Sequence, residues 1–183
     1  MTTLVGISGS LRRGSFNTAL LRAAAAAAPA GVRLEVMDLR GVPLYDGDVE
    51  AAEGVPAAVT RLKDAVAAAD GLLLATPEYN NSVPGVLKNA VDWMSRPSED
   101  IARVFGGKAA AVIGASPGGF GTVLGQAAWL PVLRALGTRP WFGGRLLVSR
   151  AHTVFDESGA LKDDALRGQL EGFLRGFAAA AAG

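Results

Sequence analysis

The sequence contains no cysteine and only one histidine, His152. The absence of cysteine excludes disulfide bonds, a thiolate nucleophile, a zinc–thiolate site and an iron–sulfur cluster of the usual kind. One histidine is too few to build a histidine cage around a metal ion. His152 follows the last predicted strand, and we assign it no role. The sequence therefore offers no thiol and no histidine-based metal centre for catalysis.

Long apolar runs and an excess of charge are also lacking. No apolar run approaches the ~20 residues of a membrane-spanning helix, and the first ten residues do not resemble a basic leader followed by an apolar core. Lysine and arginine number 18 against 17 aspartates and glutamates, so nothing favours a broad basic surface for nucleic acid or an anionic membrane. We expect a cytoplasmic protein, for which a compact anionic ligand remains possible.

The sequence does contain short apolar segments at regular intervals along the chain. The chain has 183 residues, half of them apolar. This length is close to the roughly 150 residues typical of one domain, so we predict a single domain over 1–183. Short β-like runs alternate with longer helical stretches, which is typical of a parallel sheet covered by helices on both faces. The predicted fold class is α/β, with five parallel strands in a three-layer, doubly wound sheet of order 2-1-3-4-5.

The run at 71–76, GLLLAT, is apolar throughout, as expected for a strand in the sheet centre. The other predicted strands are 3–8, 33–39, 108–116 and 138–149. Five helices are predicted. The first ends near Ala28, the second and third cover 55–69 and 85–94, the fourth ends near Leu136, and the fifth covers 163–182. Segments 40–54 and 96–107 are predicted to be irregular.

The loop after the first predicted strand, SGSLRRGSFN at 8–17, is suited to an anion. Hydroxyls, an amide and Arg12 stand at a helix start, where unpaired N–H groups and the helix dipole favour negative charge. Gly9 and Gly14 fit half of a P-loop, but the phosphate-binding lysine is missing. An ordinary helix N-cap uses the same residue types, and that alternative stays open.

The loops after the third and fourth predicted strands are also unusual. In PEYNNSVP, at 77–84, two prolines stiffen a segment rich in amides, which could form a fixed wall against a flat ligand. In ASPGGFGT, at 115–122, three glycines permit close backbone approach. The alternative for 77–84 is that prolines and asparagines are simply common in loops, and the alternative for 115–122 is an ordinary turn. In a doubly wound sheet these loops meet the first one, and together they suit an aromatic phosphate ester.

These three segments resemble motifs of the NADPH-dependent FMN reductase family, a flavodoxin-like group that includes quinone, chromate and azo-dye reductases. GSLRRGSFN is similar to its phosphate loop, PEYNNSVPGVLKNAVDW to its most distinctive motif, and SPGGFGT to its flavin-edge loop. The motifs occur in the family's order and spacing. One departure is Leu124, where relatives often carry an arginine two residues before the glutamine that matches Gln126.

The resemblance implies an FMN site in three parts. Ser10, Arg12, Ser15 and Asn17 would hold the FMN phosphate. Pro77, Glu78, Tyr79, Asn80 and Asn81 would line the ribityl chain and the isoalloxazine, largely through backbone groups. Ser116, Gly118 and Gly119 would approach the pyrimidine edge.

The resemblance also implies the activity: an FMN-containing oxidoreductase that takes a hydride from NADPH or NADH and passes electrons to a quinone, free flavin or other small oxidant. No catalytic side chain and no metal are expected. Family members are usually homodimers or homotetramers, with Trp93 and Met94 as candidates for the interface, and 40–54 and 96–107 are expected to border the flavin. The alternatives are a flavodoxin-type electron carrier without its own NAD(P)H oxidation and a non-redox phosphate binder.

Overall fold

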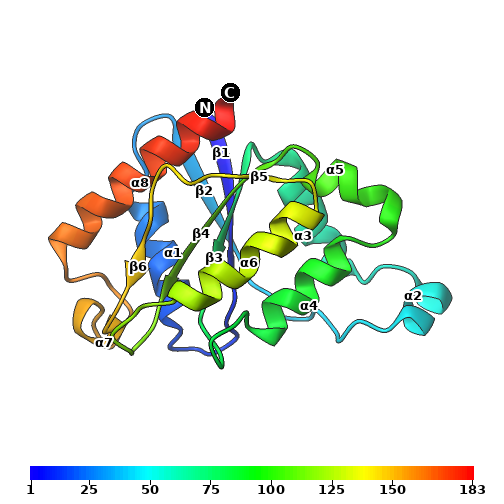
Figure 1. The fold of residues 1–183 in the computed structure, drawn as a ribbon, viewed down its shortest axis with the longest axis horizontal. Coiled ribbons are helices and arrows are strands. Elements are labelled where there is room, and N and C mark those ends of the chain that lie inside the picture. The colour runs from blue at the N-terminus through cyan, green and yellow to red at the C-terminus, as the bar shows by residue number, and fades with distance from the viewer.

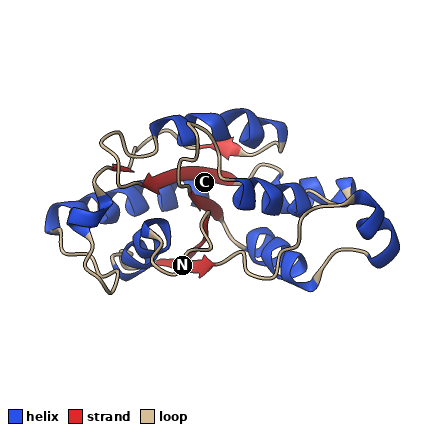
Figure 2. Ribbon diagram, turned by 90° about the horizontal axis from the view of Figure 1, so that it is seen from below, coloured by secondary structure: helices blue, strands red, loops and turns tan.

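The computed structural model describes residues 1–183 and has a parallel sheet with helices on both faces (Figures 1 and 2). The strand order is β2-β1-β3-β4-β5, with β6 also pairing β4, and every pairing is parallel. The predicted order and the three-layer architecture are confirmed. The strands are β1 (Thr2–Ser8), β2 (Val32–Met37), β3 (Gly71–Ala75), β4 (Ala109–Ala115), β5 (Arg139–Pro140) and β6 (Leu147–Val148).

The edge strand differs from the prediction. The single strand expected at 138–149 is split, because β5 pairs with the start of β4 and β6 pairs with its end. The Trp141 N–H still bonds to the Ala110 carbonyl at 2.7 Å, after which the chain leaves the sheet. Gly143 and Gly144 pass so close to the Trp141 ring that a Cβ on either would lie within 3 Å of it. The strand is therefore interrupted at a point where only glycine fits against the indole.

All five predicted helices are present, and four short ones were not predicted. The expected helices are α1 (Phe16–Ala26), α3 (Ala57–Ala68), α4 (Gly85–Met94), α6 (Val123–Ala135) and α8 (Asp164–Ala182). The additional ones are α2 (Gly47–Glu53), the 3-10 helix η1 (Ser98–Asp100), α5 (Ile101–Phe105) and α7 (Ala151–Val154). The prediction that 40–54 and 96–107 are irregular throughout is therefore wrong. Helix α2 buries no residue, so it has no apolar face that a periodic pattern could have shown.

Two apolar cores lie on opposite faces of the sheet. One is formed mainly by α1 and α8, with Leu20 and Phe177 fully buried. The other is formed by α3, α4, α5 and α6, with Trp93 and Trp129 fully buried. Strand β3 is buried along its whole length, as its sequence predicts, because successive side chains enter opposite cores.

The carboxyl ends of β1, β3 and β4 lie at one edge of the sheet, toward the bottom of Figure 1. Segment 40–54 starts at this edge, where Arg40 Nη2 donates to the Leu11 carbonyl at 3.1 Å. The second half of 96–107 does not border this edge, because it leads into the amino end of β4. There the Gly107 N–H bonds to Gly137, and Arg103 pairs with Asp64 of α3 at 3.1 Å. The expectation that 96–107 borders the flavin is wrong for this part.

None of the helices is both long and apolar enough to cross a membrane.

Candidate functional site

The first loop ends in a capped helix with free donors. Ser15 is the N-cap of α1, and its Oγ accepts from the Thr18 N–H at 3.2 Å. The N–H groups of Phe16 and Asn17, in the first turn, have no backbone acceptor. The N-cap interpretation of Ser15 is thus correct, and it is compatible with anion binding, because the remaining N–H groups point out of the helix end.

Arg12 places a positive charge beside this helix end. Its Nη2 donates to the Gly14 carbonyl at 2.7 Å, and its guanidinium lies 5.7 Å from the Phe16 ring centroid. Ser10 Oγ accepts from the Arg12 N–H at 3.4 Å. Arg12 forms no ion pair with a carboxylate, so its charge is free to act on an anion.

Asn17 is turned toward the sheet. Its Nδ2 donates to the Ala115 carbonyl and its Oδ1 accepts from the Ala115 N–H, both at 2.9 Å, and the side chain is buried. The side chain therefore ties α1 to the end of β4. The resemblance implied a phosphate contact for this residue, but in the structure its amide holds the first loop against the root of the third.

The second loop contains a tight two-residue turn. Tyr79 and Ser82 exchange backbone hydrogen bonds at 3.1 and 3.0 Å. Between them Asn80 and Asn81 have φ of 52° and 60°, as both central residues of a type I′ turn require. Asparagine tolerates positive φ better than other residues with side chains. The two amides are therefore explained first by backbone conformation, and any contact with a ligand comes in addition.

Glu78 connects the second loop to the third. Its Oε2 accepts from the backbone N–H groups of Leu124 and Gly125 at 2.8 and 2.9 Å. The N-cap residue of α6, Thr122, provides no side-chain cap. Glu78 thus caps α6 from another loop, a role that the sequence did not indicate.

The third loop is fixed by hydrogen bonds at its base and open at its tip. Ser116 Oγ donates to the Gly121 carbonyl at 2.6 Å, and Gly121 has φ of 64°. The Gly118 carbonyl accepts from the Arg150 N–H at 2.9 Å. Gly118 and Gly119 are exposed, and their N–H groups have no acceptor. The loop is thus an ordinary turn, as the alternative interpretation predicts, and it also presents free N–H donors.

Glycines allow the three loops to pack closely. A Cβ on Gly9 would lie 2.8 Å from Cδ of Pro77, and a Cβ on Gly114 would lie 2.4 Å from the Thr76 carbonyl oxygen. The Gly9 N–H also bonds to the Ala75 carbonyl at 2.9 Å. The structure therefore brings all the predicted binding residues to one edge of the sheet, although Asn17 and Glu78 direct their side chains to the protein.

The segment 40–54 is held against α4 by polar and aromatic contacts. The Tyr45 ring packs edge-on against Trp93, with centroids 4.9 Å apart, and its hydroxyl donates to Glu50 at 2.9 Å. Arg96 bonds to the same carboxylate at 2.9 Å and lowers the pKa of Glu50. These contacts hold Tyr45 and α2 against the carboxyl end of α4.

Two further expectations concern the surface. Trp93 and Met94 are fully buried within this chain, so their assignment to a subunit interface is wrong. Their apolar side chains fill the core under α4, which the sequence could not distinguish from an interface. Leu124, the departure from the family pattern, is exposed on α6.

Comparison with known proteins agrees with this geometry. Residues 2–153 match the family model described as NADPH-dependent FMN reductase. The chain is 48% identical over 164 residues to an NAD(P)H-dependent FMN reductase of Pseudomonas aeruginosa, covering 90% of this chain and 86% of the relative. It is 38% identical over 173 residues to a 2-hydroxy-1,4-benzoquinone reductase of a Burkholderia species, covering 94% and 92%.

Solved structures give the same result. The flavoenzyme FerB of Paracoccus denitrificans, an NAD(P)H:(acceptor) oxidoreductase, superposes with a TM-score of 0.87 at 32% identity, covering 100% of this chain and 98% of FerB. The chain therefore belongs to the NADPH-dependent FMN reductase family, a family of oxidoreductases.

Proposed function

We propose that the protein is an NAD(P)H-dependent FMN oxidoreductase that reduces quinones, free flavin or another small oxidant. Family membership implies FMN as cofactor and NAD(P)H as electron donor. The observation that carries the proposal is the convergence of three donor-rich loops at one sheet edge, with Arg12 beside the open end of α1. The relatives named as an FMN reductase and a benzoquinone reductase support the same reaction type.

The residues present fit a planar phosphate ester. The unpaired N–H groups of Phe16 and Asn17, the Ser10 hydroxyl and the Arg12 guanidinium form a compact set of donors for a phosphate. Such a set suits a dianion because charge-assisted bonds add to the helix dipole. In this proposal Ser15 contributes through the helix cap and Asn17 through its hold on β4.

The other two loops fit the flat part of the cofactor. The stiff turn from Pro77 to Asn81 would form a wall, and the free N–H groups of Gly118 and Gly119 would meet the polar edge of a ring, with Ser116 fixing their loop. Bound FMN would supply the redox chemistry, accepting hydride from the nicotinamide and passing electrons on. The protein's own task is then to bind, orient and shield, and no side chain need act as acid, base or nucleophile.

We further propose that residues 1–183 form one domain and that the protein is a homodimer or homotetramer. One sheet is shared by both cores, which supports a single cooperative unit. Leu44 lies just before the projecting helix α2 and Val49 lies within it, and both leave apolar surface exposed. The exposed fraction of Leu44 is 84%. A partner subunit would cover such a surface.

The proposal is tested with purified protein. We expect bound-flavin absorbance that is bleached when NADPH or NADH is added without oxygen and restored by a quinone. Arg12→Gln should weaken FMN binding, whereas Arg13→Gln, next to it but outside the motif, should not. A screen of quinones, FMN, chromate and azo dyes with both nicotinamides would identify the acceptor.

The main alternative is an electron carrier that binds FMN but does not oxidise NAD(P)H. Such carriers are usually strongly acidic because they dock on basic partners, whereas this chain has 18 cationic and 17 anionic residues. Flavin that stays oxidised with both nicotinamides would favour the carrier. A protein that retains no flavin would disprove both.

A further inference from the structure

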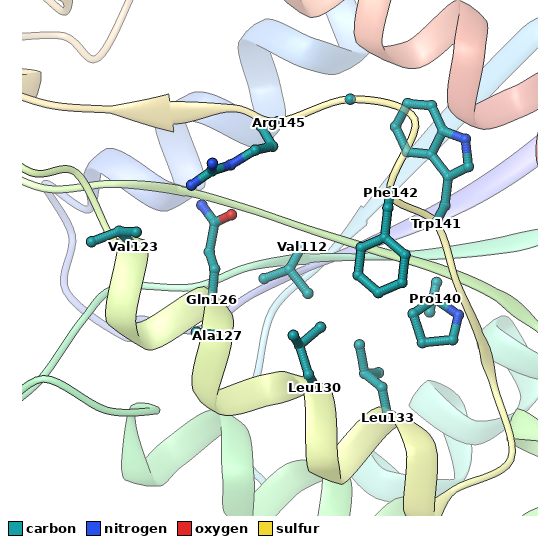
Figure 3. Close-up of a pocket in the computed structure, with 12 residues that line it drawn as sticks. Val112, Val123, Gln126, Ala127, Leu130, Leu133, Pro140, Trp141, Phe142 and Arg145 are labelled. Carbon is teal, nitrogen blue, oxygen red and sulfur yellow. The ribbon is translucent and has the colours of Figure 1, made fainter.

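A cavity of about 310 Å³ lies beside α6, where the edge strand is interrupted (Figure 3). We call the chain from Trp141 to Leu146, between β5 and β6, the arch. Val112 of β4 faces the space between the arch and α6. The cavity is lined by Ala110, Val112, Val123, Gln126, Ala127, Leu130, Leu133, Pro140, Trp141, Phe142, Gly144 and Arg145.

The apolar part of this cavity lies between α6 and the arch, and Trp141 holds the arch in place. The Trp141 indole packs edge-on against Phe173, with ring centroids 5.0 Å apart, and tilted against Phe177 at 5.6 Å. Gly144 lies against the same indole. Leu130 stands on α6 and Phe142 on the arch, where this residue is 71% exposed. The indole therefore anchors the arch on α8, while Leu130 and Phe142 form the exposed rim of the cavity.

The other end of the cavity is polar and carries an uncompensated charge. Gln126 Nε2 donates to Thr122 Oγ1 at 3.1 Å and to the Leu146 carbonyl at 3.0 Å, so its orientation is fixed. Arg145 forms neither an ion pair nor a side-chain hydrogen bond. Figure 3 shows its guanidinium pointing toward the Gln126 amide, at the end away from Phe142 and Pro140.

We propose that this cavity is a binding site for a small planar aromatic carboxylate. The ring would lie among Phe142, Leu130 and Val112, which face one another in Figure 3, and the carboxylate would accept charge-assisted hydrogen bonds from Arg145. Its volume is at the small end of ligand sites, which suits one or two fused rings. None of the residues proposed to hold FMN lines this cavity, so the site is separate from the proposed reaction and does not depend on it.

The test uses the protein as purified, with 2-naphthoate as probe and the uncharged 2-naphthamide as its match in shape. Isothermal titration should show saturable binding of naphthoate, about tenfold tighter than naphthamide if the ion pair contributes some 1.4 kcal/mol. Arg145→Gln should remove that difference. Arg134→Gln, an exposed arginine of α6 outside the cavity, should leave it unchanged.

A second variant tests whether the probe binds in this cavity. Leu130→Trp should fill the cavity and abolish binding of both compounds, while thermal unfolding shows that the fold is kept. Unchanged naphthoate binding in Leu130→Trp would put the probe elsewhere and overturn the proposal, as would equal binding in wild type and Arg145→Gln. If wild type does not bind the probe and Phe142→Ser reduces the oligomer size, a second copy of the chain covers this face, and the proposal is wrong.

Discussion

Glu78 and Gly125 join two loops of the candidate site, since the Glu78 carboxylate accepts from the Gly125 N–H at 2.9 Å while also bonding to Leu124. The residues are 47 positions apart in the chain. This single side chain satisfies donors that would otherwise be free at the amino end of α6. The position of the third loop therefore depends on the second, and a change in one should be felt in the other.

Replacing Glu78 by alanine should lower the free energy of unfolding by about 1 kcal/mol, the usual effect of losing a helix cap. FMN retention should fall as well, because the third loop loses its link to the second. Urea unfolding and flavin release during gel filtration measure the two effects. Glu53→Ala, at an exposed carboxylate of α2 with no bonding partner, is the control, and an equal effect of both variants would contradict the capping role.

The sequence predicts those features that depend on local pattern. The apolar run of β3 identified the sheet centre, and the composition of the three loops located the edge where they meet. It did not predict that Asn17 bonds to Ala115 or that Glu78 caps α6, because both contacts join residues far apart in the chain. A loop rich in polar residues gives no signal of whether a side chain faces a ligand or another loop.

Two other differences have physical causes that a pattern does not carry. The edge strand is interrupted where Gly143 and Gly144 pass against the Trp141 indole, and that indole is held by tertiary contacts with Phe173 and Phe177 of α8. Trp93 and Met94 look suitable for an interface by residue type, but α4 turns both into the core. Apolar character alone does not distinguish these two destinations.

Variants at Asn80 and Asn81 can separate the effect of backbone conformation from that of side-chain chemistry. Alanine at both positions should destabilise the protein by about 1 to 2 kcal/mol per residue, because a Cβ is disfavoured at positive φ. Glycine at both should be close to neutral. If the backbone makes the flavin contacts, the glycine pair should also retain most of its FMN, and the alanine pair should lose it.

Flavin titration and thermal unfolding of the two double variants decide this. Loss of FMN from a stable glycine pair would show instead that the amides themselves hold the cofactor. Equal stability of the alanine and glycine pairs would contradict the turn assignment.

Asn17→Ala should be among the more damaging single changes in the first loop. It leaves the buried N–H and carbonyl of Ala115 without partners, and each unsatisfied group costs about 1 to 3 kcal/mol. Asn17→Asp should not rescue, because a carboxylate can accept from the Ala115 N–H but cannot donate to its carbonyl. Thr18→Ala, which removes only the hydroxyl contact with Ser8, should cost less. Chemical unfolding ranks the three variants, and an aspartate variant as stable as wild type would disprove the two-way bond.

The ion cluster around Asp100 should make stability depend on pH. Arg103 and then Lys63 lower the pKa of Asp100 from 3.8 to about 2. A carboxyl group with a depressed pKa stabilises the fold above its unfolded value near pH 3.8, and that contribution is lost as the pH falls toward 2. Lys63 is 3% exposed and bonds to Asp100 at 2.6 Å, so neutralising the carboxylate leaves a buried ammonium without its counter-ion.

We therefore expect Asp100→Asn to lower the melting temperature at pH 6 and to reduce its further fall between pH 4 and pH 2. Asp164→Asn, at a carboxylate that is 93% exposed, should follow the wild-type curve. Melting curves from pH 2 to 7 check this with all three proteins. Parallel curves for wild type and Asp100→Asn over pH 2 to 4 would show that the ion pairs of Asp100 do not contribute to the acid sensitivity. The site loops lie at the other end of the strands, so flavin retention at pH 7 should be similar in all three.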